Sequence, residues 1–126
     1  MTDGEEAKAA FSVQCVTLPE AVVVAAAGDL DLATAPVLRR EALAAVADSP
    51  PGLIVDLGEV TFCGSAGLQV LSELVTSTVD GGTAFAVVAT QYPVLRALRI
   101  TRLDATLSLH QSVEQARTWI KENPDR

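Results

Sequence analysis

The segment Leu53–Val79 constrains the fold more than any other part of the chain. It starts with Leu53–Leu57, a mostly apolar run that follows Pro50-Pro51-Gly52 and is typical of a parallel strand buried on both faces. A short stretch of small residues comes next. From Ser65 onward, apolar residues recur at three- and four-residue spacing, which predicts a helix with one apolar face. A strand, a tight connection and a helix in this order are typical of an α/β domain.

The small-residue stretch Cys63-Gly64-Ser65-Ala66-Gly67 is where function is expected. Gly64 is predicted to be a turn glycine with positive φ, and Gly67 to permit a close approach of the helix to its surroundings or to a partner. Ser65 is predicted to be the N-cap, with a hydroxyl that accepts a hydrogen bond from a first-turn amide. Cys63 is interpreted as a small turn or core residue, although a helix start can also lower a thiol pKa. The buried face of the helix is predicted to contain Leu68, Leu71, Leu74, Val75, Thr78 and Val79.

The remaining patterns predict strands and helices on both sides of this segment. Residues 11–15 and 21–27 read as a hairpin of strands, and a helix follows from about Thr34, with Pro36 in its first turn. Strands are predicted at 83–89 and 105–109. A helix containing Pro93 lies between them, and Ser112 with Gln115 has the spacing of a capping box.

The predicted fold class is therefore α/β, in the order β-β-α-β-α-β-α-β-α. A mixed central sheet has an N-terminal hairpin and helices packed on it. Residues 11–121 are expected to form one domain, with loose tails at 1–10 and 122–126.

Charge and composition limit the classes of partner. The chain has 126 residues and a net charge of -7, which argues against binding to nucleic acid or to an anionic membrane. No segment has the length of a membrane span or the pattern of a signal peptide, so a cytoplasmic protein with reduced Cys15 and Cys63 is expected. Asp29 and Asp31 are interpreted as loop and cap residues, and neither a metal nor a cofactor is expected. A protein partner remains.

Arg96, Arg99 and Arg102 form the one cationic grouping in the sequence. Their three-residue spacing places them roughly on one side of a helix. A solvated face near a helix C-terminus is the favoured interpretation, and a phosphate or partner site is the alternative.

Several motifs together resemble the STAS domain family, named for sulphate transporters and anti-sigma factor antagonists. The pattern V-D-L-x-x-V-x-F-x-x-S-x-G-L over residues 55–68, followed by an apolar helix, resembles the central signature of that family. Gly28-Asp29-Leu30-Asp31 with Thr34-Ala35 resembles its element before the first helix, and residues 94–103 resemble the segment leading to its last strand. The resemblance covers nearly all of residues 11–120.

The resemblance implies a free-standing anti-sigma factor antagonist that binds a kinase-type anti-sigma factor and thereby releases a sigma factor. It implies that Ser65 is phosphorylated by this anti-sigma factor serine kinase, which binds the ATP itself, and that phosphorylation switches the antagonist off. The residues implied to contact the partner are Asp29, Asp31, Cys63, Gly64, Ser65, Ala66 and Gly67. One departure matters, because the family commonly has Asp immediately before the serine and this chain has Gly64.

Two other functions remain open. The chain could be a STAS subunit of an ABC-type transporter or of a sensory assembly, with a serine that is never modified. It could also be a hydrolase with Ser65 as nucleophile, but the G-x-S-x-G pattern needs glycine where Cys63 stands, and His110 is the only histidine. An enzyme is therefore not expected, and the oligomeric state is left open between a monomer and a weak homodimer.

Overall fold

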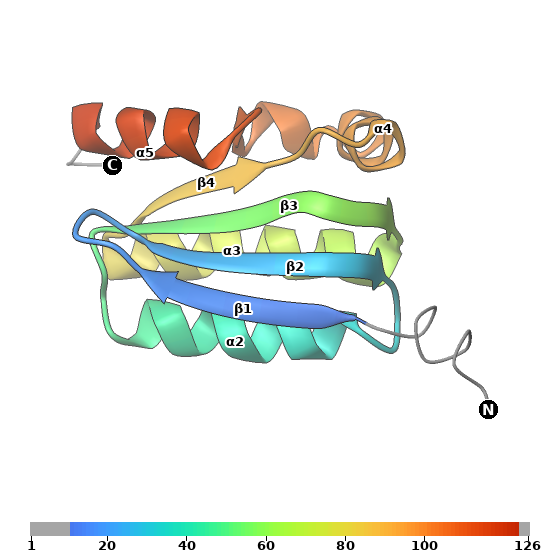
Figure 1. Ribbon diagram of the computed structural model, residues 1–126, viewed down its shortest axis with the longest axis horizontal. Helices are drawn as coiled ribbons and strands as arrows, with labels where there is room; N and C mark the ends of the chain where they lie inside the picture. Colours follow the sequence, from blue (N-terminus) through green and yellow to red (C-terminus); the bar gives the residue numbers. More distant parts are fainter. Residues whose placement is uncertain (1–10, 124–126) are drawn as a thin grey trace.

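The computed structural model describes residues 11–123, which form an open sheet with helices on both faces (Figure 1). These residues contain five strands, four α-helices and one short 3-10 helix. The strands are β1 (Ser12–Thr17), β2 (Val22–Leu30), β3 (Gly52–Cys63), β4 (Ala84–Val88) and β5 (Ser108–His110). The helices are α2 (Ala35–Ala47), α3 (Ser65–Gly81), α4 (Tyr92–Ile100), α5 (Val113–Glu122) and the 3-10 helix η1 (Leu103–Ala105).

The sheet has the strand order β1-β2-β3-β4-β5. β1 runs antiparallel to β2, with Ser12 opposite Ala27 and Thr17 opposite Val22, and all the other neighbouring pairs are parallel. Because β2 to β5 are parallel, their carboxyl ends lie at one edge of the sheet, which is the edge at which ligands bind in open α/β sheets. In Figure 1 the arrowheads of β2, β3 and β4 point to this edge.

Two hydrophobic cores hold the helices to the sheet. α2 and α3 pack on one face, in a core that includes Leu38, Leu53 and Leu71, and α4 adds to the same core. α5 packs alone on the other face, in a smaller core that includes Ile54 and Ile120. Successive residues of a strand point to opposite faces, so β3 supplies both cores. This arrangement explains why its first residues are apolar without alternation.

The predicted order of strands and helices, the mixed sheet and the N-terminal hairpin are all confirmed. Gly82 is also confirmed as the end of α3, because it is the C-cap with a φ of 71°. The predicted N-terminal tail, residues 1–10, lies outside the described residues, and so do residues 124–126 of the predicted C-terminal tail. α5 continues to Glu122, which was predicted to be the first residue of that tail.

Some details of the prediction were wrong. Val79 is 71% exposed, whereas Gly67 and Val70 lie on the buried face of α3. The last strand starts at Ser108 rather than at residue 105, because residues 103–105 form η1. Arg102 does not continue the helix of Arg96 and Arg99, since its φ of 66° is left-handed and lies beyond the end of α4.

The largest difference concerns β3, which was predicted to end at Leu57 and continues to Cys63. Two register shifts against β2 give β3 extra residues, one shift between Ala25 and Ala27 and one between Gly28 and Asp29. β4 pairs with β3 only as far as Asp56. The second half of β3 therefore extends past β4, and α4 packs beside β3.

Candidate functional site

The loops after β2 and β3 lie side by side at the carboxyl edge of the sheet. β2 and β3 remain paired to their last residues, with Asp29 opposite Phe62 and Leu30 opposite Cys63. The amide of Gly64 continues this ladder by donating a 2.9 Å hydrogen bond to the carbonyl of Leu30. Two of the three sequence motifs on which the family resemblance rests, residues 28–35 and 55–68, therefore form one continuous surface.

Gly64 is the whole connection between β3 and α3, and it serves as the N-cap of the helix. Its φ of -87° and ψ of -176° are extended, so the prediction of positive φ was wrong. Its carbonyl accepts the first helical hydrogen bond, from the amide of Leu68 at 3.1 Å. A glycine cap has no side chain with which to bind the amides of the first turn.

Ser65 is the first residue of α3 rather than its N-cap, which corrects the second prediction about this turn. Its side chain is exposed, and its hydroxyl has no hydrogen-bond partner within residues 11–123. The amides of Ser65, Ala66 and Gly67 likewise have no partner in that range. An exposed hydroxyl thus lies next to unpaired amides at the positive end of the helix dipole, where an added anion is stabilised.

Gly67 and Cys63 are the two buried residues of the turn, and they lie against each other. A β-carbon on Gly67 would lie 2.7 Å from Cδ2 of Leu30 and 3.0 Å from Sγ of Cys63, so no larger residue fits without movement. Cys63 is 6% exposed, and burial raises the pKa of its thiol to about 11. The thiol therefore stays protonated at neutral pH. Both residues shape the turn from inside the fold, whereas Ser65 is exposed to solvent.

Asp29 and Asp31 organise the neighbouring loop. One carboxylate oxygen of Asp31 accepts hydrogen bonds from the amides of Ala33 and Thr34, at 3.0 and 3.1 Å. The hydroxyl of Thr34 donates to the carbonyl of Asp29 at 2.7 Å and does not cap α2, although Thr34 is its N-cap residue. The side chain of Asp29 accepts a 3.0 Å hydrogen bond from the hydroxyl of Thr61. These hydrogen bonds hold the loop together, and the bond to Thr61 joins it to β3 beside the Ser65 turn.

Three exposed apolar side chains at this edge were missed by the sequence analysis. Leu32, in the loop after β2, is 83% exposed, and Phe62 and Tyr92 are 48% and 65% exposed. Exposed apolar side chains gathered beside polar ones are typical of protein contact surfaces. Leu32 could have been found, because an isolated leucine between Asp31 and Ala33 has no core to join in a polar turn.

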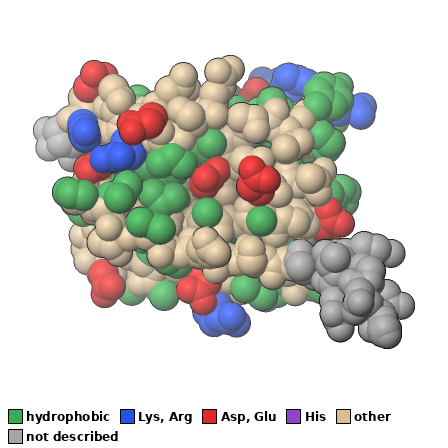
Figure 2. Space-filling model, viewed as in Figure 1, with side chains coloured by type: hydrophobic (Ala, Val, Ile, Leu, Met, Phe, Trp, Pro, Cys, Tyr) green, Lys and Arg blue, Asp and Glu red, His purple; other side chains and the backbone are tan. Residues whose placement is uncertain are grey.

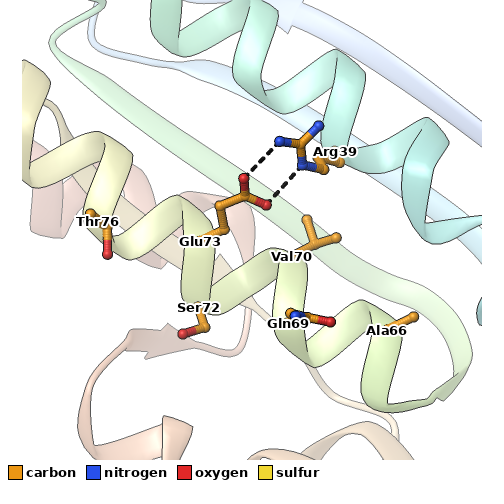
Figure 3. Close-up of a pocket in the computed structure, with 7 residues that line it drawn as sticks. All are labelled: Arg39, Ala66, Gln69, Val70, Ser72, Glu73 and Thr76. Carbon is orange, nitrogen blue, oxygen red and sulfur yellow. Dashed lines mark hydrogen bonds and ion pairs between the residues drawn. The ribbon is translucent and has the colours of Figure 1, made fainter.

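A polar groove of about 520 Å³ runs along α3 from Ala66 to Thr76, and Arg39 of α2 also lines it (Figure 3). The guanidinium of Arg39 on α2 donates two 2.8 Å hydrogen bonds to the carboxylate of Glu73 on α3. These bonds lower the pKa of Glu73 and raise that of Arg39. In Figure 3 the hydroxyls of Ser72 and Thr76 point away from this ion pair. The pair links α2 to α3 about two helical turns beyond Ser65.

His110 lies at the end of β5, so β4 separates it from β3 in the sheet. Its Nε2 is 2.8 Å from the hydroxyl of Ser108, and its ring stacks at a tilt on Trp119 with the centroids 5.7 Å apart. Burial lowers the pKa of His110, so its ring is neutral at neutral pH. The structure therefore pairs the histidine with Ser108 and not with Ser65.

Residues 11–123 contain no group of three or more His, Cys, Asp or Glu side chains placed to hold a metal ion. Across the same residues, no helix has the length and apolar character needed to cross a membrane.

Known proteins resemble this chain in both sequence and structure. Residues 12–116 match the STAS domain family. The anti-sigma-F factor antagonist RsfB of Mycobacterium tuberculosis is 32% identical over 99 residues, which cover 79% of this chain and 80% of RsfB. An anti-sigma factor antagonist from Mycobacterium paratuberculosis has a crystal structure that superposes with a TM-score of 0.81 and 34% identity, covering 89% of this chain and 95% of that one.

The fold alone is shared more widely. A sulfate transporter family protein from Wolinella succinogenes superposes with a TM-score of 0.73 at 16% identity, over 85% of this chain and 89% of that one. The family assignment therefore rests on the sequence match along the whole sheet and on the two mycobacterial relatives. On that evidence, the chain belongs to the STAS domain family.

Proposed function

We propose that the protein is an anti-sigma factor antagonist. It binds a kinase-type anti-sigma factor through the edge formed by the loops after β2 and β3, and the bound anti-sigma factor releases its sigma factor. The kinase transfers the γ-phosphoryl group of its own ATP to the hydroxyl of Ser65, and the phosphorylated antagonist dissociates. No cofactor of the antagonist takes part in this cycle.

The observation that carries the proposal is the position of Ser65. Its hydroxyl is exposed and unpartnered at the first residue of α3, so a kinase can reach it without unfolding the domain. Phosphorylation adds about -1.5 to -2 charges at neutral pH. This charge lies next to the unpaired amides of Ala66 and Gly67, at the favourable end of the helix dipole. The folded state therefore tolerates the phosphate.

The phosphate therefore changes the binding of the partner rather than the stability of the domain. Gly64 and Ala66 place little side-chain bulk around Ser65, which favours close contact with a partner. Burial of a dianion without a matching cation in the partner is costly, and we expect it to weaken binding on the order of a hundredfold. Asp29 and Asp31 beside the turn add charge of the same sign and supply no compensating cation.

The sequence relatives support this function over the transporter alternative. RsfB and the Mycobacterium paratuberculosis protein are named antagonists and are 32% and 34% identical to this chain, whereas the transporter-family protein shares 16%. A likeness at that lower level concerns the fold and does not favour a transporter subunit.

A reconstitution tests the proposal. Affinity capture on the Ser65→Ala variant first identifies the anti-sigma factor in the organism's own extract. The purified anti-sigma factor is then loaded with its sigma factor, and this protein is added with ADP or with ATP. We expect displacement of the sigma factor in both cases, followed with ATP by loss of activity and a single phosphate on Ser65. A phosphate on Thr61 or Ser72, or no displacement at any concentration, would refute the proposal.

A further inference from the structure

A second surface lies beside the Ser65 turn, on α4 and the extended end of β3. Its centre is a hollow of about 410 Å³ lined by Phe62, Tyr92, Arg96 and Ile100, among others. We refer to these four residues together with Arg99 as the α4 surface. Figure 2 shows hydrophobic and basic side chains together at the corner where Figure 1 places α4. The surface exists because β3 continues past β4, which lets α4 pack beside the end of β3.

The α4 surface is unusually apolar for its degree of exposure. Six large hydrophobic side chains of the described residues are exposed, and three of them, Phe62, Tyr92 and Ile100, surround this hollow. Val94 and Leu98 form the buried face of α4 and lie in the core shared with α2 and α3. Packing within the domain therefore does not account for the exposed apolar side chains on the outer face of the same helix.

The charge of the α4 surface is opposite to that of the whole chain. Arg96 and Arg99 form no ion pair with any residue in the range 11–123, and neither does Arg102 just beyond the helix. By contrast, Arg39 and Arg117 are both bound to carboxylates. In a chain with a net charge of -7, three arginines without a carboxylate partner thus lie on or just after α4, and one of them, Arg96, lines the apolar hollow.

Interaction with the helix dipole at the C-terminal end of α4 explains only some of these three arginines. Arg99 lies in the last turn of α4, where a cation interacts favourably with the helix dipole, but Arg96 lies in the middle of the helix. Arg102 has a left-handed φ of 66°, a position at which glycine is unstrained and other residues lose roughly 1 kcal/mol.

We infer that the α4 surface binds an acidic, amphipathic helical segment of a protein partner. The apolar face of such a segment would cover Phe62, Tyr92 and Ile100, and its carboxylates would pair with Arg96 and Arg99. Under the proposed function, on which this identification of the partner rests, the segment belongs to the anti-sigma factor. The α4 surface and the Ser65 turn are continuous through Phe62 and Cys63, so one partner can contact both.

A second copy of the chain is a poorer occupant. A two-fold symmetric contact through this surface brings its arginines toward those of the other copy. Nucleic acid is disfavoured by the net charge, although arginines beside aromatic rings can bind it, so it is included in the test.

The test uses the isolated chain and a peptide probe, without an anti-sigma factor. The probe is a helical peptide of about five turns with Leu and Phe on one face and Glu on the other. A matched peptide has Lys at every Glu position, and an oligothymidine represents nucleic acid. Titrations are followed by amide chemical shifts of the labelled protein, at low and at high salt. We expect saturable shifts at Phe62 and along α4 with the acidic peptide, with weaker binding as salt rises.

Variants separate the surface from nonspecific attraction. Arg96→Glu with Arg99→Glu should weaken binding of the acidic peptide roughly tenfold or more, because two exposed ion pairs are lost and replaced by repulsion. Arg40→Glu with Lys121→Glu makes the same change of net charge on α2 and α5 and should leave the affinity unchanged. Ile100→Ser should weaken binding, whereas Val79→Ser, at a similarly exposed position on α3, should not.

The outcomes are decisive in either direction. Equal affinity for the lysine peptide, shifts centred elsewhere, tighter binding of the oligothymidine or absence of saturable binding would each overturn the inference. If the peptide fails and sigma factor release still occurs, the inference alone is wrong. If the peptide binds as expected and no anti-sigma factor is bound, the proposed function alone is wrong.

Discussion

The first turn of α3 rests directly on the end of β2, because a β-carbon on Gly67 would lie 2.7 Å from Cγ and Cδ2 of Leu30. This contact fixes how closely the first turn of α3 approaches the end of β2. It also makes the two halves of the site interdependent, because Leu30 precedes the loop of Asp31 and Gly67 follows Ser65.

Gly67→Ala should therefore destabilise the domain. Overpacking typically costs about 1–3 kcal/mol, and the gain in helix propensity, up to about 1 kcal/mol, offsets only part of it. Gly81→Ala in the same helix is the matched control, because a β-carbon there meets nothing closer than 3.9 Å. Urea unfolding should show a loss of stability for position 67, and for position 81 a gain of at most about 1 kcal/mol because no steric cost opposes the helix propensity. Equal stabilities would contradict the close contact.

Gly64→Asp should leave the fold intact. The backbone at Gly64 is extended, a β-carbon would come within 3.2 Å only of the half-exposed Phe62 ring, and aspartate is a favoured N-cap. We expect a gain in stability of a few tenths of a kcal/mol and a faster initial rate of phosphorylation. The same substitution at Gly82, where φ is 71°, should cost about 1 kcal/mol. If position 64 proved as costly as position 82, the assigned backbone conformation would be wrong.

The ion pair between Glu20 and Arg117 should make stability depend on pH. Arg117 donates a hydrogen bond to Glu20, and this bond lowers the pKa of that carboxylate. Because the folded pKa lies below the unfolded value of about 4.3, the pair stabilises the fold above that pH. Its contribution is lost as the pH falls through the lowered pKa. Glu20→Gln should thus reduce stability at neutral pH and have a smaller effect at about pH 3.

Glu114→Gln is the control for this pH dependence. Glu114 lies 3.6 Å from the same arginine, and its side chain is 81% exposed. Its substitution should have little effect at any pH, because exposed pairs contribute little. An effect of Glu20→Gln that does not change with pH would show that the charge of Glu20 is unimportant.

The two cysteines should differ in reactivity. Cys15 is exposed on β1, although partial burial and the nearby Glu41 raise the pKa of its thiol. Cys63 is buried, and the pKa of its thiol is about 11. Iodoacetamide should therefore modify Cys15 in the native protein and Cys63 only after unfolding, as peptide mass spectrometry can show. Modification of native Cys63 at the rate of Cys15 would contradict its placement beneath the turn.

The order of strands and helices was predictable because each element has a clear period. Leu53, Ile54 and Val55 are apolar without alternation since β3 faces two cores, and the spacing of Ser112 and Gln115 correctly located the start of α5. The hydroxyl of Ser112 accepts a 3.1 Å hydrogen bond from the amide of Gln115. These signals are local, so the sequence alone carries them.

The shape of the site was less predictable, since it depends on contacts between distant residues. Gly64 looked like a turn glycine, but the ladder to Leu30 keeps its backbone extended. The second half of β3 contains Glu59 and Thr61, whose side chains are exposed to solvent, and these polar residues kept it from resembling a buried strand in the sequence. The apolar part of the α4 surface follows from that extension and was missed for the same reason, whereas Arg96 and Arg99 were noted in the sequence, with a phosphate or partner site as the alternative to a solvated face.

The central claim is that Ser65 acts as an electrostatic switch at an interface and not as a switch of folding. Ser65→Ala should bind the anti-sigma factor about as well as the wild type, and Ser65→Glu, with a single charge, more weakly. Circular dichroism should show the same fold for the wild type, both variants and the phosphorylated protein. These comparisons separate a change of charge at the interface from loss of structure.

The most direct measurement is a calorimetric titration of the anti-sigma factor with the unmodified protein and with the protein phosphorylated on Ser65. The account predicts that phosphorylation weakens binding on the order of a hundredfold while the melting temperature of the free domain stays the same. Equal affinities of the two forms would contradict the switch at the interface, and a phosphorylated domain that no longer folds would contradict its electrostatic basis.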